Sequence, residues 1–194
     1  HRGPMSFASE VRFALGSFAD HALALTMLST CAVCYREGTQ LCRECRVALE
    51  RRLRPEPNES QARSSSILAP LTQLEWCAPF TGVTRRVLAR LSDGGGRRLS
   101  DPLGRAIADR WRAAGGGGDV LVPVPAPAAK NRDRGFDAAV LRARIAGHRL
   151  RLPVVEALGR AAYGASPPPI GEAFEVLAPR RIDGLSVVLV DDVV

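Results

Sequence analysis

Four of the five cysteines lie close together, in two C-x-x-C pairs. The pairs are Cys31-Ala-Val-Cys34 and Cys42-Arg-Glu-Cys45, and seven residues separate them. A C-x-x-C turn folds two sulfur atoms to one side of the chain, so two pairs complete a tetrahedral four-sulfur site of the kind that structural zinc occupies. Gly38 stands where a hairpin turn is needed, and we therefore expect a compact zinc ribbon. An iron–sulfur or mononuclear iron site and a redox disulfide pair are the alternatives. The fifth cysteine, Cys77, is predicted to be a small core residue.

A basic loop follows a predicted buried strand. The strand is Asp-Val-Leu-Val-Pro-Val-Pro at 119–125, and a helix is predicted to begin near residue 136. Backbone N–H groups and the helix dipole attract anions to a helix start, and the loop adds cationic side chains. The loop residues expected to bind diphosphate are Lys130, Arg132, Arg134 and Gly135. The alternative is an exposed basic loop without a ligand.

Two carboxylates end the last apolar run of the chain. Asp191 and Asp192 directly follow Val-Val-Leu-Val at 187–190. This run predicts a strand buried on both faces, in the middle of a parallel sheet. Open α/β sheets bind ligands beyond the carboxyl ends of their strands, so the acids are candidate ligand-binding groups. A solvated turn after the strand is the alternative.

Charge and hydropathy indicate which ligands the protein favours and whether it spans a membrane. The 194 residues include 27 basic and 20 acidic residues, a formal net charge of +7. This balance favours anionic ligands such as phosphate esters or nucleic acid, although a basic surface without a partner fits it equally well. Residues 7–28 have apolar side chains at helical spacing, so we expect a helix there. Charged residues interrupt this stretch, so we expect no membrane span. Clustered cysteines without a secretory signal predict a cytoplasmic protein.

The remaining pattern predicts an α/β protein with a parallel sheet flanked by helices. Strands are expected at 74–80 (an edge strand), 119–125, 152–157 and 187–190, and helices at 84–91, 102–114 and 136–147. Ser100 or Asp101 is expected to cap the helix at 102–114. The predicted organisation is an N-terminal helical segment (1–28), a zinc ribbon (29–50), a polar linker (51–73) and an α/β domain (74–194).

Together these motifs resemble the ComF family, competence-associated bacterial proteins that join a cysteine ribbon to a type I phosphoribosyltransferase domain. The resemblance covers about residues 28–194 and is carried by the cysteine pairs and three further motifs. These are Val-Pro-Val-Pro at 122–125, Arg-Asp-Arg-Gly-Phe-Asp at 132–137 and Val-Leu-Val-Asp-Asp-Val-Val at 188–194. The resemblance implies that the basic loop holds diphosphate and that Asp191 and Asp192 hold the ribose hydroxyls of phosphoribosyl diphosphate (PRPP), with magnesium nearby.

The chain also departs from the family pattern. The family continues past the acids with a Thr-Thr-Gly-Ala loop for the 5′-phosphate, whereas this sequence stops at Val194. The segment 161–174 lacks the usual Gln and Arg–Asn pair, and Ser92 stands near the position of a common lysine. The resemblance implies a PRPP-binding phosphoribosyltransferase linked to DNA uptake, and we expect this 194-residue form to be C-terminally truncated and inactive. The alternatives are a non-catalytic module that binds single-stranded DNA or a helicase, and a structural zinc ribbon on a degenerate domain.

Overall fold

The computed structural model describes residues 29–54, 71–93, 96–126, 135–160 and 173–192. The predicted helix at 7–28, most of the linker and the loop at 127–134, with Lys130, Arg132 and Arg134, lie outside the described residues. The helices are α2 (Arg43–Arg52), α3 (Gly82–Ser92), η2 (Arg97–Leu99), α4 (Ser100–Ala113), α6 (Ala138–Leu150) and η4 (Pro179–Arg181). The strands are β1 (Val120–Pro123), β2 (Leu158–Arg160), β3 (Phe174–Val176) and β4 (Val187–Val190).

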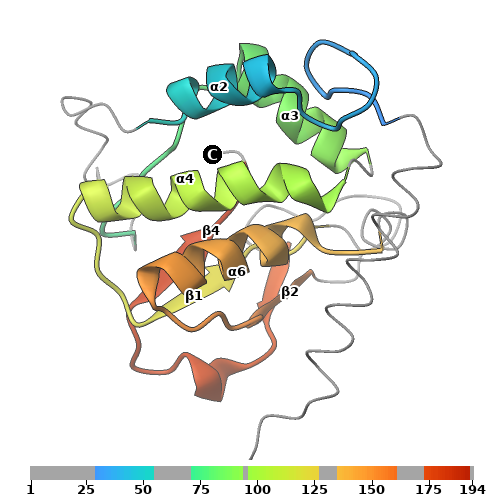
Figure 1. Cartoon of the computed structure of the whole chain (residues 1–194). Helices are drawn as coiled ribbons and strands as arrows, with labels where there is room; N and C mark the ends of the chain where they lie inside the picture. The colour runs from blue at the N-terminus through green and yellow to red at the C-terminus, as the bar shows by residue number, and fades with distance from the viewer. Residues whose placement is uncertain (1–28, 55–70, 94–95, 127–134, 161–172, 193–194) are drawn as a thin grey trace, which may run out of the picture.

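The helices and strands form stacked layers (Figure 1). Helices α2 and α3 lie together on one side of α4, and α4 and α6 run side by side across one face of the strands. No helix in the described part of the chain is long and apolar enough to cross a membrane. The mixed helix and strand architecture with a small parallel sheet agrees with the predicted α/β class.

The parallel pair β1–β4 is the centre of the strand layer. Val120 pairs with Val187 and Pro123 with Val190, and an isolated parallel bridge joins Leu121 to Val154 on the other side of β1. The expected strand at 152–157 is therefore reduced to this one bridge. Strands β2 and β3 form a separate antiparallel pair.

Strand β1 is buried throughout, but β4 is not. All four β1 residues are buried, as expected for a Val-Leu-Val run in a parallel sheet. On β4, Val188 and Val190 face the core, whereas Val187 is 38% and Leu189 is 49% exposed. The prediction that this strand is buried on both faces is wrong: only the face turned toward α4 and α6 is covered in the described structure.

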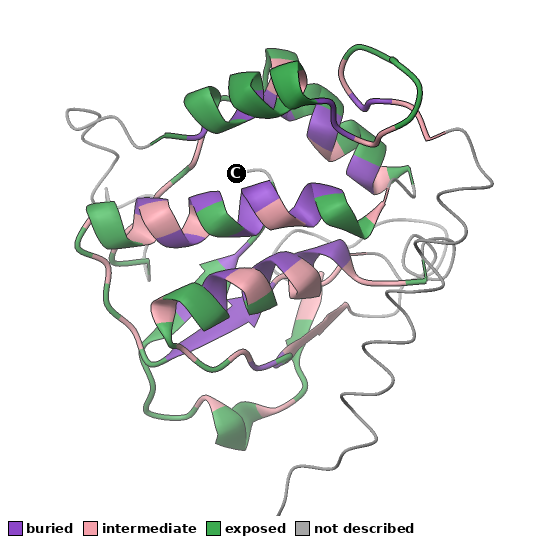
Figure 2. Ribbon diagram, viewed as in Figure 1, coloured by how far each residue is buried: buried purple, intermediate pink, exposed green. Residues whose placement is uncertain are grey.

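One core joins the cysteine region to the helices of the α/β part. It combines Cys31, Leu41 and Leu49 with buried residues from α3, η2 and α4, and it extends to Ala138 at the start of α6. Figure 2 shows these inward faces as buried, while the outer faces of α2 and α3 are exposed. The predicted boundaries at residues 28, 50 and 73 stay predictions, but residues 29–53 do not form a hydrophobic core of their own.

Helices α4 and α6 approach each other closely because a glycine lies between them. A Cβ added to Gly104 would lie 2.7 Å from Ile145 Cβ and 2.9 Å from the Arg142 carbonyl oxygen. The start of α6 is fixed by Asp137, whose carboxylate accepts from the Ala139 and Val140 backbone N–H groups at 2.8 and 3.2 Å. The α4 cap was predicted wrongly: Ser100 and Asp101 are already inside the helix, which begins directly after η2.

The segment 74–80 is another correction. It forms bends and irregular structure in place of the expected edge strand. Its anchor is an ion pair between Glu75 Oε2 and Arg110 Nε of α4, at 2.9 Å with both side chains nearly buried. Such a pair fixes the segment against the helix, and the residue types of the segment alone did not indicate it.

Candidate functional site

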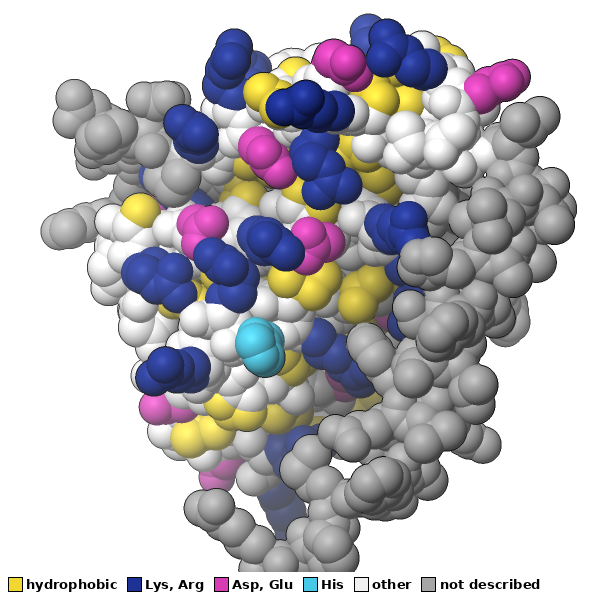
Figure 3. All heavy atoms as spheres, in the orientation of Figure 1, with side chains coloured by type: hydrophobic (Ala, Val, Ile, Leu, Met, Phe, Trp, Pro, Cys, Tyr) yellow, Lys and Arg dark blue, Asp and Glu magenta, His cyan; other side chains and the backbone are white. Residues whose placement is uncertain are grey.

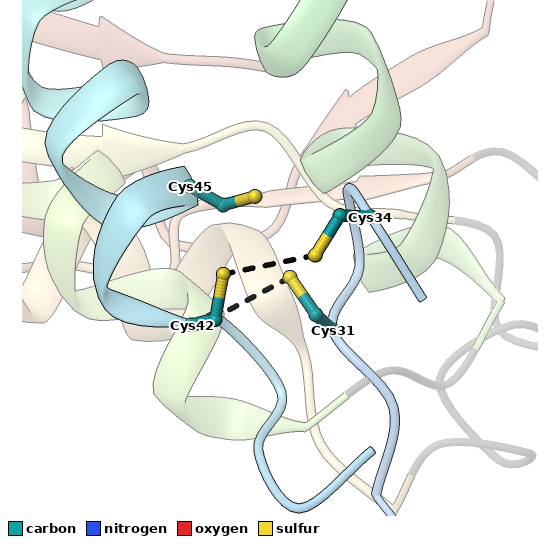
Figure 4. Close-up of side chains that lie close together, drawn as sticks. All are labelled: Cys31, Cys34, Cys42 and Cys45. Carbon is teal, nitrogen blue, oxygen red and sulfur yellow. Dashed lines mark hydrogen bonds between the residues drawn. The ribbon is translucent and has the colours of Figure 1, made fainter. Parts of the chain in front are cut away.

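The four clustered cysteines converge on one point (Figure 4). Their sulfur atoms all lie within 4.8 Å of one another. The first pair is held by a tight turn, in which the Tyr35 N–H donates to the Cys31 carbonyl at 3.0 Å and Tyr35 adopts a φ of 62°. The second pair stands at the start of α2, where Cys42 is the N-cap residue and Cys45 lies in the first turn. The sequence predicted the convergence but not that a helix supplies half of it.

The arrangement has the dimensions of a tetrahedral metal site. A tetrahedron with metal–sulfur bonds of about 2.3 Å has sulfur–sulfur edges of about 3.8 Å. Cys34 Sγ and Cys42 Sγ lie 3.7 Å apart, and the other pairs need to close by at most about 1 Å. The four-cysteine group can therefore hold a metal ion such as zinc.

Local electrostatics prepare one of these thiols for ionisation. Burial disfavours the Cys31 thiolate, but the backbone N–H groups of Cys34, Cys42 and Val33 outweigh it and lower the Cys31 pKa to about 6. Burial raises the pKa of the Cys45 thiol. Four thiolates at this spacing repel one another unless a cation lies between them, so the cluster can ionise fully only around a metal ion.

The second candidate site is the edge of the sheet where β1 and β4 both end. Parallel pairing brings Val124 and Asp191 to this edge, and the Val124 N–H donates to the Val190 carbonyl at 2.9 Å. Gly135, exposed and with a φ of 70°, stands just before Asp137, which caps α6. Of the four residues predicted to bind diphosphate, Gly135 alone is among the described residues, so the loop as a ligand site stays a prediction.

The acids at this edge are accompanied by arginines that the sequence did not single out. Asp192 forms an ion pair with Arg142 of α6, a side chain that is 2% exposed. Arg160 of β2 donates to the Pro125 carbonyl at 2.9 Å and stacks over the Phe174 ring at 4.9 Å. The only sequence signal for Arg142 was a charged residue on an otherwise small and apolar helix face.

Burial and the nearby cations act in opposite directions on Asp191. Burial is the larger effect and raises the pKa of the Asp191 carboxyl, and Arg142 and Arg160 offset only part of that rise. The carboxylate also accepts from the Asp192 backbone N–H at 2.7 Å, which fixes its orientation. Both acids and Arg142 line a groove of about 1170 Å³ that continues between β4 and the segment 71–80. The edge is thus open to a ligand and carries both signs of charge.

Comparisons with protein-family models, with curated proteins and with solved structures find no match to this chain.

Proposed function

We propose that this chain is a phosphoribosyltransferase-like protein that binds PRPP at the shared carboxyl edge of β1 and β4, on a domain held together by a structural zinc ion. The choice of PRPP as the ligand rests on the resemblance to the ComF family. The observation that carries the proposal is the parallel register, because it brings Asp191 and Asp192 to the same edge as the chain leaving β1.

The chemistry would be a displacement at the anomeric carbon, passing through an oxocarbenium-like state. In this proposal Lys130, Arg132 and Arg134 hold the diphosphate leaving group, and Asp191 and Asp192 position the ribose. Magnesium would arrive bound to the phosphate oxygens of PRPP and neutralise part of their charge. Zinc fits the four thiols by donor type and spacing, and it would cross-link the first turn of α2 to the loop before it.

The test of this function is protection of the edge by inorganic diphosphate and by PRPP. Hydrogen exchange should slow in residues 135–140 when either ligand is added with magnesium. The double change Arg132→Ala and Arg134→Ala should weaken the protection at least about tenfold, since charged hydrogen bonds contribute about 1.5–3 kcal/mol each.

The matched control removes two arginines from the other end of the sheet. Arg180 and Arg181 are exposed on η4, before β4 begins, so their replacement by alanine should leave the protection unchanged. An equal loss of protection in both double variants would mean that anion binding depends only on the net charge of the protein, and the proposed site would be wrong.

A second function, binding of nucleic acid without sequence preference, is favoured by how arginines pair. All six arginines of α4 and α6 form ion pairs, with Asp101, Asp109, Glu75, Glu156 or Asp192. None of the seven arginines of α2 and α3 forms an ion pair with a described residue. They are Arg43, Arg46, Arg51, Arg52, Arg85, Arg86 and Arg90. Figure 3 shows basic side chains over both helix layers with acidic ones between them.

Arginines that have no acid partner among the described residues are available to neutralise phosphates. The arginines of α2 and α3 would bind the phosphates of a single nucleic-acid strand. Tyr35, which is 73% exposed beside the cysteine site, would offer a surface on which a base can stack. Fluorescence anisotropy with a labelled single-stranded oligonucleotide should show binding that weakens with salt. Arg85→Ala with Arg90→Ala should reduce affinity, whereas the paired control Arg105→Ala with Arg149→Ala should do so much less. The same loss in both variants would exclude α2 and α3 as the binding surface.

A further inference from the structure

Arg142 is the exceptional residue on the inner face of α6. The other buried residues of this helix are alanine and glycine, namely Ala138, Ala139, Ala143, Ala146 and Gly147. Arg142 is 2% exposed, and its guanidinium extends to Asp192, the second residue after β4. The long Arg142 side chain therefore extends from a helix face of small residues to the carboxyl edge of the sheet.

A guanidinium in this position remains charged. An arginine side chain is too basic for burial to neutralise it, so an anion must stay beside it. Removing one partner of a buried ion pair leaves an uncompensated charge, which is strongly unfavourable. Asp192 supplies such an anion in the described structure.

The neighbouring carboxylate, Asp191, also lies close to these cations. Arg142 and Arg160 both act electrostatically on Asp191, and Arg160 is held in place by the Pro125 carbonyl and the Phe174 ring. Two carboxylates and two guanidiniums meet at this edge, so the group as a whole carries no net charge.

This balance is unlike that of a divalent-cation site. Magnesium and manganese are bound by carboxylates whose negative charge is available to them. At this edge an entering cation would meet two guanidiniums already in place, and Coulomb repulsion would oppose it.

We propose that Arg142 is a resident cation of the acid pair: it positions Asp192 and excludes free divalent cations from the edge. If the edge binds PRPP, which rests on the function proposed above, magnesium enters only on the diphosphate of the ligand. The acids then act as acceptors for ribose hydroxyls and not as metal ligands.

Manganese titration of the zinc-loaded chain, followed by electron paramagnetic resonance, tests this inference. The wild-type chain should bind no Mn²⁺ at micromolar concentrations in the absence of PRPP. Arg142→Leu, which keeps an apolar side chain in the helix face, should gain a site that binds Mn²⁺ at least about tenfold more tightly. Adding Asp191→Asn to that variant should remove the gained site.

Two controls keep the result decisive. Arg142→Gln removes the charge but keeps hydrogen-bond donors for Asp192, and it should show the same gain if Arg142→Leu fails to fold. Arg144 lies on the same helix but its side chain is exposed and pairs with Glu156, so Arg144→Leu should show no gain.

Wild-type binding of Mn²⁺ at micromolar concentration, abolished by Asp192→Asn, would overturn the proposal whatever the variants do. So would folded Arg142 variants that gain no site. Failure of diphosphate to protect residues 135–140 is a separate result: it would defeat the proposed function but leave the exclusion of free cations intact.

Discussion

Cys34 and Cys77 differ in what surrounds their sulfur atoms. Cys34 is exposed and faces three other thiols, whereas Cys77 is partly buried and packs against the core that includes Leu91 and Leu103. Burial raises the Cys77 pKa to about 11, which keeps its thiol protonated at neutral pH. Thiolates bind metal ions and thiols do not, so these two cysteines form a matched pair for testing the metal site.

We predict close to one zinc ion per chain, lost in Cys34→Ser and retained in Cys77→Ser. The first change removes one of four ligands, and the second removes only a core sulfur. Elemental analysis of the three purified proteins measures the result. Iron in place of zinc, or full metal content in Cys34→Ser, would contradict the assignment.

At the scale of elements, the contact between α4 and α6 depends on Gly104. An alanine there gains helix propensity of about 1 kcal/mol, but its Cβ meets Ile145 Cβ and the Arg142 backbone at under 3.0 Å. Neither neighbour is the free end of a flexible side chain, so the helices must separate. We predict that Gly104→Ala lowers the free energy of unfolding by about 1–3 kcal/mol.

Gly117→Ala is the control, because an added Cβ at Gly117 would have no neighbour within 4 Å. Its effect should stay within about 0.5 kcal/mol in the same urea titration. An equal loss in both variants would mean that backbone flexibility, and not the helix contact, explains the change.

The elements that local pattern could identify are those whose apolar residues repeat at a regular spacing. Helix α3 has Val87 and Leu91 one turn apart on its buried side, and β1 is an uninterrupted apolar run, so both were found close to their observed bounds. The segment 74–80 was assigned wrongly because Trp76 and Phe80 suggested a strand, whereas an ion pair between Glu75 and a distant helix determines its position. The residues around Glu75 give no indication that Arg110, 35 residues later, is its partner.

The candidate sites divide in the same way. The cysteine spacing encodes its own geometry, and the four sulfur atoms meet as predicted. The acid pair was found from its place after a strand, but its partner Arg142 lies fifty residues earlier in a helix. The half-exposed state of β4 was also missed, since Val187 and Leu189 look the same in sequence as Val188 and Val190.

For the whole molecule, the shared core links metal binding to overall stability. Cys31 and Cys42 belong to the same buried group as Leu99, Leu103 and Ala138. We predict that a strong chelator lowers the thermal unfolding midpoint of the zinc-loaded protein. Circular dichroism should show one transition, in which the cysteine region and helices α4 and α6 unfold together.

Cys34→Ser provides the control for chelation. It should unfold at the lowered midpoint without chelator and change little when chelator is added. Two separate transitions, only one of them sensitive to metal, would show that the cysteine region is stabilised independently of α4 and α6.

The parallel pairing of β1 with β4 has a consequence for synthesis on the ribosome. The hydrogen bond that opens this pairing joins residues 67 positions apart, Asp119 and Ser186. At roughly 5–20 residues per second, β1 leaves the ribosome about 3–13 seconds before its partner strand exists. During that time the side of β1 that pairs with β4 has unpaired backbone groups, although residues 153–155 can already bond to Leu121 on the other side. Helices α2, α3 and α4 are already available to pack around the cysteines. A chaperone that binds extended apolar segments would therefore find β1 in the nascent chain, and release it when β4 emerges.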